Sequence, residues 1–381
     1  MTSVARVVAI AAVLGCAFAG SVAQGATAQL TILSMTVTDT QHVWVLGLSC
    51  PPSPNQSCSN LVVRGSQDGG LSWPIQEHVP AAPNFFGKGV SHAYVRNLQY
   101  ATPQDAYASG PSLLTSHDGG ETWTWQRSIY SVEALAPVGN EVWAVSDLCP
   151  RSGACPVYLY RSPASGDAWH RTTLPLRAPA GASQIVTADN GHVWILTTQV
   201  TTRVPWGRPT LIESTTSGRR WVRRPDPCPV GESNIDRLAT DDGVHLWLVC
   251  GGQPAAGGEL MSLYRSPDGG RHWRLVASNE YILAKHKKLP AARFVYGGYV
   301  DSLAVTGPQT AWFSLDRGTL FTTRDGGKIW HPATRQNVDP EDATVGPVLF
   351  ATPSDGWLAS YPNLIFRTVN GGKAWQRIPV G

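Results

Sequence analysis

Ser116-His117-Asp118-Gly119-Gly120-Glu121-Thr122-Trp123 is one copy of the motif that decides the fold of this 381-residue chain. The other copies begin at Ser66, Ser162, Ser214, Ser266, Thr323 and Thr368. The aspartate is present as Asp68, Asp118, Asp268 and Asp325, becomes Asn370 in the last copy, and is missing from the two degraded copies at 162 and 214. The motif tryptophans are Trp73, Trp123, Trp169, Trp221, Trp273, Trp330 and Trp375. Their mean spacing of about 50 residues indicates a repeat architecture.

A second aromatic signal runs in phase with the motif. Each motif follows a short apolar segment with one aromatic residue, and these residues are Trp44, Tyr107, Trp143, Trp194, Trp247, Trp312 and Trp357. Each repeat contains four short strand patterns, such as 235–239, 246–248, 263–265 and a strand that begins at Trp273. Four strands separated by turn residues, repeated seven times, predict an all-β, seven-bladed β-propeller with four antiparallel strands per blade.

The motif has a structural explanation that requires no ligand. An aspartate in a turn accepts hydrogen bonds from the backbone N–H groups that follow it, and glycine adopts backbone angles that other residues avoid. We expect the tryptophan to close the hairpin between the third and fourth strands by burying its ring between blades. One carboxylate per turn is far from the ligand set of a calcium site. The motif residues are therefore assigned a structural role, and we expect no metal and no cofactor.

The pattern Ser/Thr-x-Asp-x-Gly-x-x-Trp resembles the Asp-box, or BNR repeat. This repeat occurs in sialidases, sortilin-type receptors, two-propeller xyloglucanases and the photosystem II stability/assembly factor family. In size, blade number and single-domain layout, the chain is most similar to the last of these families. The resemblance implies the propeller fold and a role in assembling or stabilising a protein complex outside the cytoplasm, without indicating the partner.

The first 28 residues resemble a bacterial signal peptide. Arg6 precedes an apolar run, 7–15, that is too short to span a bilayer as a helix. Cleavage after residue 28 would leave residues 29–381 as a single propeller. Alternatively, the sequence around Cys16 resembles a lipobox, and lipidation of Cys16 would anchor the protein to a membrane. We expect a secreted or extracytoplasmic bacterial protein that is attached to a membrane only if it is lipidated.

The cysteines support export. Apart from Cys16 they form three pairs that are close in sequence: Cys50 with Cys58, Cys149 with Cys155, and Cys228 with Cys250. Such pairs staple loops in an oxidising compartment, and zinc is not expected because no C-x-x-C spacing occurs. We therefore predict three disulfides.

No catalytic site is assigned from the sequence. Sialidases have six blades and an Arg-Ile-Pro motif ahead of the first repeat, whereas the Arg-Ile-Pro of this chain is at 377–379, after the last repeat. A glycosidase requires two carboxylates flanking the cleaved bond. Glu133, Asp236 and Asp301 take equivalent places two residues before the Leu of their first strands, near the expected mouth of the central channel. They are either binding or catalytic carboxylates or merely solvated residues at strand starts.

The long insertions predict a binding face. Residues 74–96, 198–210 and 274–300 are expected to emerge on the rim opposite the motifs. They carry the aromatic residues that the repeat does not use, together with Arg293 and the basic run 285–288. The candidate binding residues among them are Phe85, Phe86, Trp206, Tyr281, Arg293, Tyr296 and Tyr299. Aromatic residues beside arginine are typical of protein interfaces.

The composition of the chain limits the classes of partner that it can bind. A formal net charge of +3 and a charged fraction of 15% argue against a nucleic-acid-binding protein. The prediction is a monomeric, non-enzymatic propeller that binds an unknown protein or glycan and acts as a scaffold. The alternative is a glycan-directed protein, either a hydrolase or a carbohydrate-binding propeller.

Overall fold

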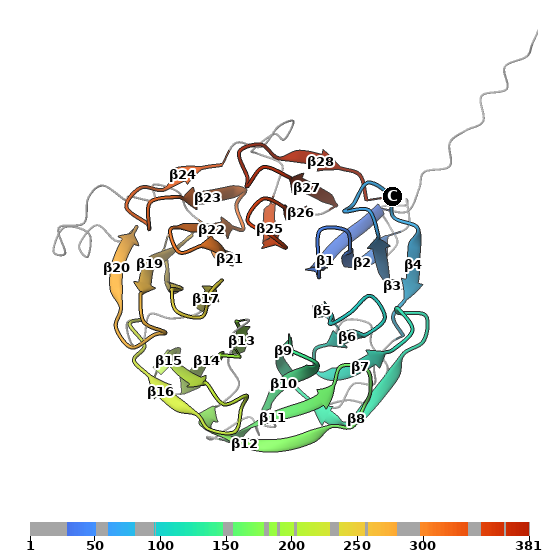
Figure 1. Ribbon diagram of the computed structural model, residues 1–381, viewed down its shortest axis with the longest axis horizontal. Helices are drawn as coiled ribbons and strands as arrows, with labels where there is room; N and C mark the ends of the chain where they lie inside the picture. The colour runs from blue at the N-terminus through green and yellow to red at the C-terminus, as the bar shows by residue number, and fades with distance from the viewer. Residues whose placement is uncertain are drawn as a thin grey trace, which may run out of the picture.

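Alternating apolar runs and glycine-rich turns fold into seven four-stranded antiparallel sheets arranged as a ring, which confirms the predicted fold (Figure 1). The computed structural model describes residues 29–50, 60–80, 95, 97–147, 155–178, 183–188, 191–201, 204–228, 236–255, 258–279, 298–333, 344–361 and 363–380. Among these residues no helix occurs, and therefore none that is long and apolar enough to cross a membrane.

Each blade is built from four consecutive strands, and the first strand lies nearest the axis of the ring (Figure 1). The first strands are β1 (Gln29–Val37), β5 (Asn97–Tyr100), β9 (Val132–Val138), β13 (Ser183–Thr187), β17 (Asp236–Thr240), β21 (Val300–Gly307) and β25 (Thr344–Phe350). The second strands are β2 (Val43–Cys50), β6 (Ala106–Ser109), β10 (Glu141–Asp147), β14 (Val193–Thr201), β18 (Leu246–Ala255), β22 (Thr310–Leu315) and β26 (Gly356–Tyr361). The third strands are β3 (Asn60–Ser66), β7 (Ser112–Ser116), β11 (Cys155–Pro163), β15 (Val204–Ser214), β19 (Gly258–Ser266), β23 (Thr319–Thr323) and β27 (Leu364–Thr368). The outer strands are β4 (Ile75–His78), β8 (Thr124–Tyr130), β12 (His170–Ala178), β16 (Val222–Arg224), β20 (Arg274–Ser278), β24 (His331–Pro332) and β28 (Gln376–Ile378).

The antiparallel order gives the ring two different faces. The turns between first and second strands and between third and fourth strands lie on one face, which we call the motif face because it carries the seven motifs. The ends of the strands that lead to the second-to-third turns and to the next blade lie on the other face, which we call the loop face.

The second strands form the core of the ring. Their aromatic residues are at most 1% exposed, because the second strand lies inside its blade and is covered by neighbouring blades on both sides. The expected burial of the motif tryptophans is complete in one blade and partial in the other six, where the rings pack against the apolar clusters. Only Trp375 is fully buried, and the others are half-buried. The motif tryptophans lie one or two residues before the outermost strand, which begins after the tryptophan rather than at it.

The motif turns have the expected hydrogen bonds. In blade 2, the backbone N–H of Thr122 donates to Asp118 Oδ1 at 2.9 Å, the hydroxyl of Ser116 donates to the same oxygen at 2.7 Å, and the N–H of Gly120 donates to Ser116 Oγ at 2.9 Å. Gly120 has φ = 105°, a backbone conformation that favours glycine. In the degraded motif of blade 4, Thr216 Oγ1 accepts the N–H of Arg220 at 2.9 Å. The Thr216 hydroxyl therefore accepts the turn hydrogen bond that the aspartate carboxylate accepts in the complete motifs.

Arginines that the sequence analysis did not single out connect neighbouring blades. Arg161, immediately before a motif, stacks on Trp143 of its own blade at 4.7 Å and donates to the carbonyl of Ser217 in the next blade at 3.0 Å. Arg265, Arg324 and Arg367 make equivalent contacts with a tryptophan of their own blade and a carbonyl of the next. Each guanidinium thus stabilises the packing of one blade against the next through a cation–π contact and a hydrogen bond.

The ring closes between blades 7 and 1. Each blade is one continuous piece of chain, so no strand is shared across this seam. The indole N–H of Trp357 donates to the carbonyl of Gly69 at 3.0 Å, and Arg367 donates to the carbonyl of Asp68 at 3.4 Å. A common apolar cluster contains Ile32, Met35, Val43 and Val45 from blade 1 and Trp357, Ala359, Ile365 and Ile378 from blade 7.

Candidate functional site: carboxylates on the loop face

Part of the predicted binding set lies outside the described residues: Phe85, Phe86, Tyr281, Arg293 and Tyr296. Trp206 belongs to β15 and Asp236 begins β17. Glu133 lies in β9 and accepts a hydrogen bond from the hydroxyl of Ser131 at 3.1 Å. Because β9 and β21 lie on opposite sides of the ring axis, the structure does not bring Glu133 and Asp301 together (Figure 1). Asp301 is the second residue of β21, and Tyr299 immediately precedes this strand.

Around the start of β21 the structure assembles a cluster that we call the acidic cluster, formed by Glu259, Asp301 and Asp316 with Arg237 beside them. Glu259 is the second residue of β19, and Asp316 follows β22, so both lie at loop-face strand ends. Arg237, the second residue of β17, donates through Nε to the carbonyl of Asp301 at 2.8 Å. Four strands from blades 5 and 6 therefore bring these charges to one place on the loop face.

Backbone hydrogen bonds hold the carboxylates of the acidic cluster in place. The N–H of Val300 donates to Glu259 Oε1 at 2.8 Å, and the N–H of Tyr299 donates to Asp316 Oδ1, also at 2.8 Å. The N–H of Glu259 donates to the carbonyl of Gly298 at 3.1 Å. The beginning of β21 is thus clamped between the second-to-third turns of two neighbouring blades.

Burial dominates the electrostatics of the acidic cluster. Burial raises the pKa of Glu259 from its ordinary value of 4.5 to about 7, although the hydrogen bond from Val300 and the charge of Arg237 act to lower this pKa. Burial likewise raises the pKa of Asp301 to about 6, opposed by Arg237 and reinforced by the negative charge of Asp316. Shifted carboxyl groups gathered in one place are typical of functional sites. Among the residues described, no set of three or more His, Cys, Asp and Glu side chains is arranged to hold a metal ion.

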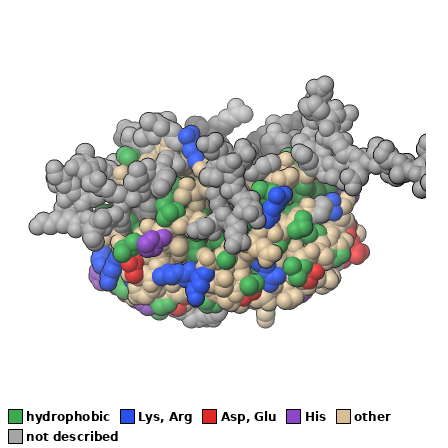
Figure 2. Space-filling view, turned by 90° about the horizontal axis from the view of Figure 1, so that it is seen from above, with side chains coloured by type: hydrophobic (Ala, Val, Ile, Leu, Met, Phe, Trp, Pro, Cys, Tyr) green, Lys and Arg blue, Asp and Glu red, His purple; other side chains and the backbone are tan. Residues whose placement is uncertain are grey.

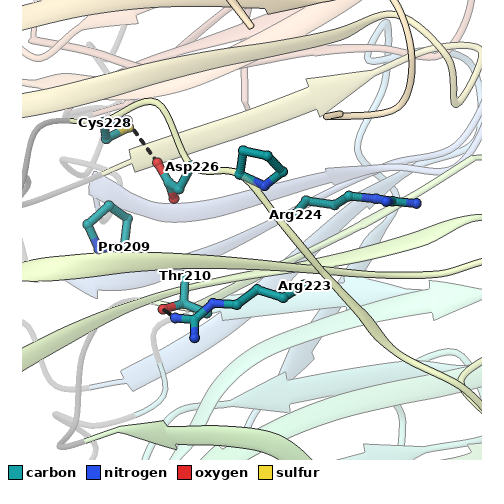
Figure 3. A pocket seen from close by; sticks show the side chains of 7 residues that line it. Pro209, Thr210, Arg223, Arg224, Asp226 and Cys228 are labelled. Atoms are coloured by element: carbon teal, nitrogen blue, oxygen red, sulfur yellow. Dashed lines mark hydrogen bonds between the residues drawn. The ribbon is translucent and has the colours of Figure 1, made fainter. Parts of the chain in front are cut away.

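A pocket of about 530 Å³ opens at the outer edge of blade 4 (Figure 3). It lies where the short strand β16 ends, because β16 pairs only with residues 211–213 of the longer β15. Its lining is Pro209, Thr210, Arg223, Arg224, Pro225, Asp226 and Cys228. The guanidinium of Arg223 turns back to Thr210 and donates to Thr210 Oγ1 at 3.0 Å, whereas the side chain of Arg224 points away (Figure 3). Arg224 instead pairs with the buried carboxylate of Glu213.

Asp226 is the titratable group of this pocket. Its Oδ1 accepts the N–H of Cys228 at 2.9 Å, and its buried Oδ2 has no hydrogen-bond partner. Burial raises the pKa of Asp226 to about 6, although the hydrogen bond from Cys228 and the charge of Arg223 act to lower this pKa.

A disulfide connects the pocket wall with the second strand of blade 5. Cys228 in the pocket wall is bonded to Cys250 in β18, which confirms one of the three predicted pairings. Cys250 is paired across the sheet with Asp236, the neighbour of Arg237. Cys58 and Cys149 lie outside the described residues, so the other two pairings stay predictions.

Lysine and arginine side chains are distributed over the ring. On the side seen in Figure 2, those of the described residues lie in separate groups among apolar, acidic and polar side chains.

The chain is similar in sequence to photosystem II assembly factors. The family model described as photosynthesis system II assembly factor YCF48 matches residues 298–381. The chain is 23% identical over 313 residues to the chloroplastic photosystem II stability/assembly factor HCF136 of Oryza sativa subsp. japonica, a match that covers 70% of this chain and 65% of the rice protein. The chain thus spans somewhat less than two thirds of that relative.

Solved structures share the fold. A structure described as YCF48 bound to D1 peptide superposes with a TM-score of 0.56 at 19% identity and covers 90% of this chain and 93% of that one. An ancestral GH74 enzyme gives the same TM-score at 14% identity and covers 93% of this chain and 47% of that one. At such identities the structural matches show the fold alone.

Proposed function

We propose, from the premise that this chain is a photosystem II assembly factor-like β-propeller, that it binds a protein segment on its loop face and helps to assemble a protein complex outside the cytoplasm. The observation that carries the proposal is the coincidence of two independent similarities. The sequence of blades 6 and 7 matches the assembly-factor model, and the whole ring has the fold of a YCF48 that holds a peptide.

The chemistry of the loop face supports binding of a protein segment. It offers one buried and several half-buried carboxylates, an arginine and a pocket lined by two prolines, all within blades 4 to 6. Polar groups beside apolar surface suit an extended peptide, whose backbone provides both donors and acceptors. The Cys228–Cys250 disulfide and the signal-like N-terminus support export, because disulfides persist in oxidising compartments.

Site-specific photocrosslinking in cells of the source organism tests the proposed function. A photoreactive phenylalanine analogue at Tyr299 reports on the loop face, and the matched control at His272, whose side chain is 85% exposed, reports on the motif face. We expect discrete protein adducts in the extracytoplasmic fraction from position 299 and none from position 272. Adducts from 272 alone, or adducts confined to cytoplasmic proteins, would contradict the proposal.

The raised pKa values of Glu259 and Asp301 favour a glycan-directed enzyme as the second candidate. A carboxyl group with a pKa near 6 to 7 is suited to general acid catalysis at neutral pH. Release of reducing ends from a polysaccharide panel by the purified protein, lost in Asp301→Asn, would establish this candidate in place of the first.

A further inference from the structure

Glu259 is the deepest member of the acidic cluster. Glu259 is only 3% exposed, yet it lies at the loop-face end of β19, close to the half-buried Asp301 and Asp316. Oε1 is satisfied by the N–H of Val300, whereas Oε2 is buried without a hydrogen-bond partner. A buried carboxylate oxygen without a donor costs free energy that a ligand with a donor would recover.

The charges around Glu259 indicate what kind of hydrogen-bond donor could bind to its unpartnered oxygen. Among the described residues, Arg237 from β17 and Asp316 from the turn after β22 act electrostatically on Glu259, and the same two groups act on Asp301, which follows the Val300 that Glu259 binds. Within the part of the chain that the structure describes, three carboxylates thus lie near one guanidinium, whose Nε already donates to the carbonyl of Asp301. An anion would be repelled at this position, and a neutral group would leave the negative charge uncompensated.

We propose that the acidic cluster of Glu259, Asp301 and Asp316 binds a cationic side chain, the ammonium of a lysine or the guanidinium of an arginine, on the partner protein. The inference rests on the proposed function, because it specifies the chemistry of the segment that the loop face holds. An organic cation fits better than a metal ion, since the described side chains provide no metal-ligating arrangement. The ammonium or guanidinium donates to Glu259 Oε2 at the floor and to Asp301 and Asp316 at the rim.

Binding of a cation to these carboxylates depends on pH. The carboxyl groups bind the cation when ionised, and their pKa values of about 7 for Glu259 and about 6 for Asp301 place the titration close to neutrality. The affinity should therefore fall as the pH is lowered from 7.5 to 5.5, with proton release on binding in between.

Fluorescence anisotropy with a defined probe tests the inference. The probe is a labelled octapeptide of glycine and serine with two lysines, and its matched control carries glutamine in place of both lysines. We expect the purified protein to bind the lysine peptide at pH 7.5 and to bind the glutamine peptide at least about tenfold more weakly, as for loss of a charge-assisted hydrogen bond. Free lysine methyl ester, added as competitor, should displace the peptide only at far higher concentration, which separates a peptide site from a small-amine site.

Variants locate the binding. Glu259→Gln and Asp301→Asn should each weaken the lysine peptide by about tenfold or more. The matched control is Asp242→Asn on the motif face, where the carboxylate already pairs with His245 at 2.6 Å, and this change should leave affinity unaltered. Thermal melts establish that each variant is folded, and Glu259→Gln should melt no lower than the wild type.

Three outcomes would overturn the inference: equal binding of the two peptides, full binding by folded Glu259→Gln, or affinity that rises towards pH 5.5. Equal loss of affinity in Asp242→Asn would also overturn it, because the effect would then be nonspecific. None of these results would affect the crosslinking at position 299. The crosslinking therefore tests the proposed function, and the peptide binding tests the specificity for lysine or arginine independently of it.

Discussion

The two faces of the ring place the same chemical group in opposite environments. On the motif face, hydrogen bonds from Thr122 lower the pKa of Asp118 to about 2, and hydrogen bonds from Ser72 do the same for Asp68. On the loop face, burial raises the pKa of Glu259 to about 7 and that of Asp226 to about 6. A motif aspartate accepts several hydrogen bonds from its own turn, whereas Glu259 and Asp226 each have a buried carboxylate oxygen that accepts none. The contrast separates carboxylates whose hydrogen bonds stabilise the turns of the fold from carboxylates that the fold leaves short of donors, which are the ones proposed to bind a ligand.

The largest expected effect belongs to the loop face and its covalent staple. The double variant Cys228→Ser/Cys250→Ser removes a bond between residues separated by 22 positions. We expect a loss of about 3 kcal/mol in the free energy of unfolding, because the reduced chain regains loop entropy in the unfolded state. Urea denaturation of the oxidised wild type and the double variant measures the difference. Equal midpoints would show that the loop face does not depend on this staple.

A smaller loss is expected on the motif face. Asp118→Ala removes the acceptor of hydrogen bonds from Ser116 and Thr122 and should cost about 1–2 kcal/mol. Thr216→Ala is the matched control in blade 4 and should cost less, since a hydroxyl accepts fewer bonds than a carboxylate. Denaturation curves give both values. Crosslinking from position 299 should persist in the folded Asp118 variant, and its loss would assign the motif face a binding role.

The smallest effect has the opposite sign. Glu259 has a higher pKa in the folded than in the unfolded protein, so the folded state holds an extra proton between about pH 4.5 and 7. Stability therefore falls as the pH rises through this window, and the unfavourable contribution is complete above pH 7. Glu259→Gln should flatten this decline and gain on the order of 1 kcal/mol at pH 8, with no gain at pH 4. A loss of stability at pH 8 would show that the carboxylate is a structural group like the motif aspartates.

The difference between the faces also explains what the sequence could predict. Blade number, strand order and the motif turns follow from local patterns, because each motif makes its hydrogen bonds within a few residues. The acidic cluster cannot be predicted from local patterns in this way. Glu259 bonds to Val300, 41 positions away, and a glutamate after a glycine at a strand start has the pattern of a solvated residue. Only Asp301 was singled out, through its equivalent place among the repeats.

The same reasoning applies to the groups that join the blades. The arginines that precede the motifs of blades 3, 5 and 7 occupy one repeat position, and that periodicity was a usable signal. Their contacts with the next blade were not predictable, since the acceptors are turn carbonyls 43 to 299 positions distant in the sequence. Asp226 gave no signal, because its burial depends on where β16 ends.

The seam between blades 7 and 1 has a consequence for how the ring forms. The hairpins of each blade are local, whereas the contacts that close the seam span 288 positions from Trp357 to Gly69 and 299 positions from Arg367 to Asp68, so they carry a large loop-closure entropy. Because each blade is continuous and no strand crosses the seam, the ring is a circular array of blades. The position of the chain termini therefore affects how the blades are connected but not how they pack. Circular permutants that move the opening to another blade boundary should therefore preserve the architecture while changing which pair of blades meets last.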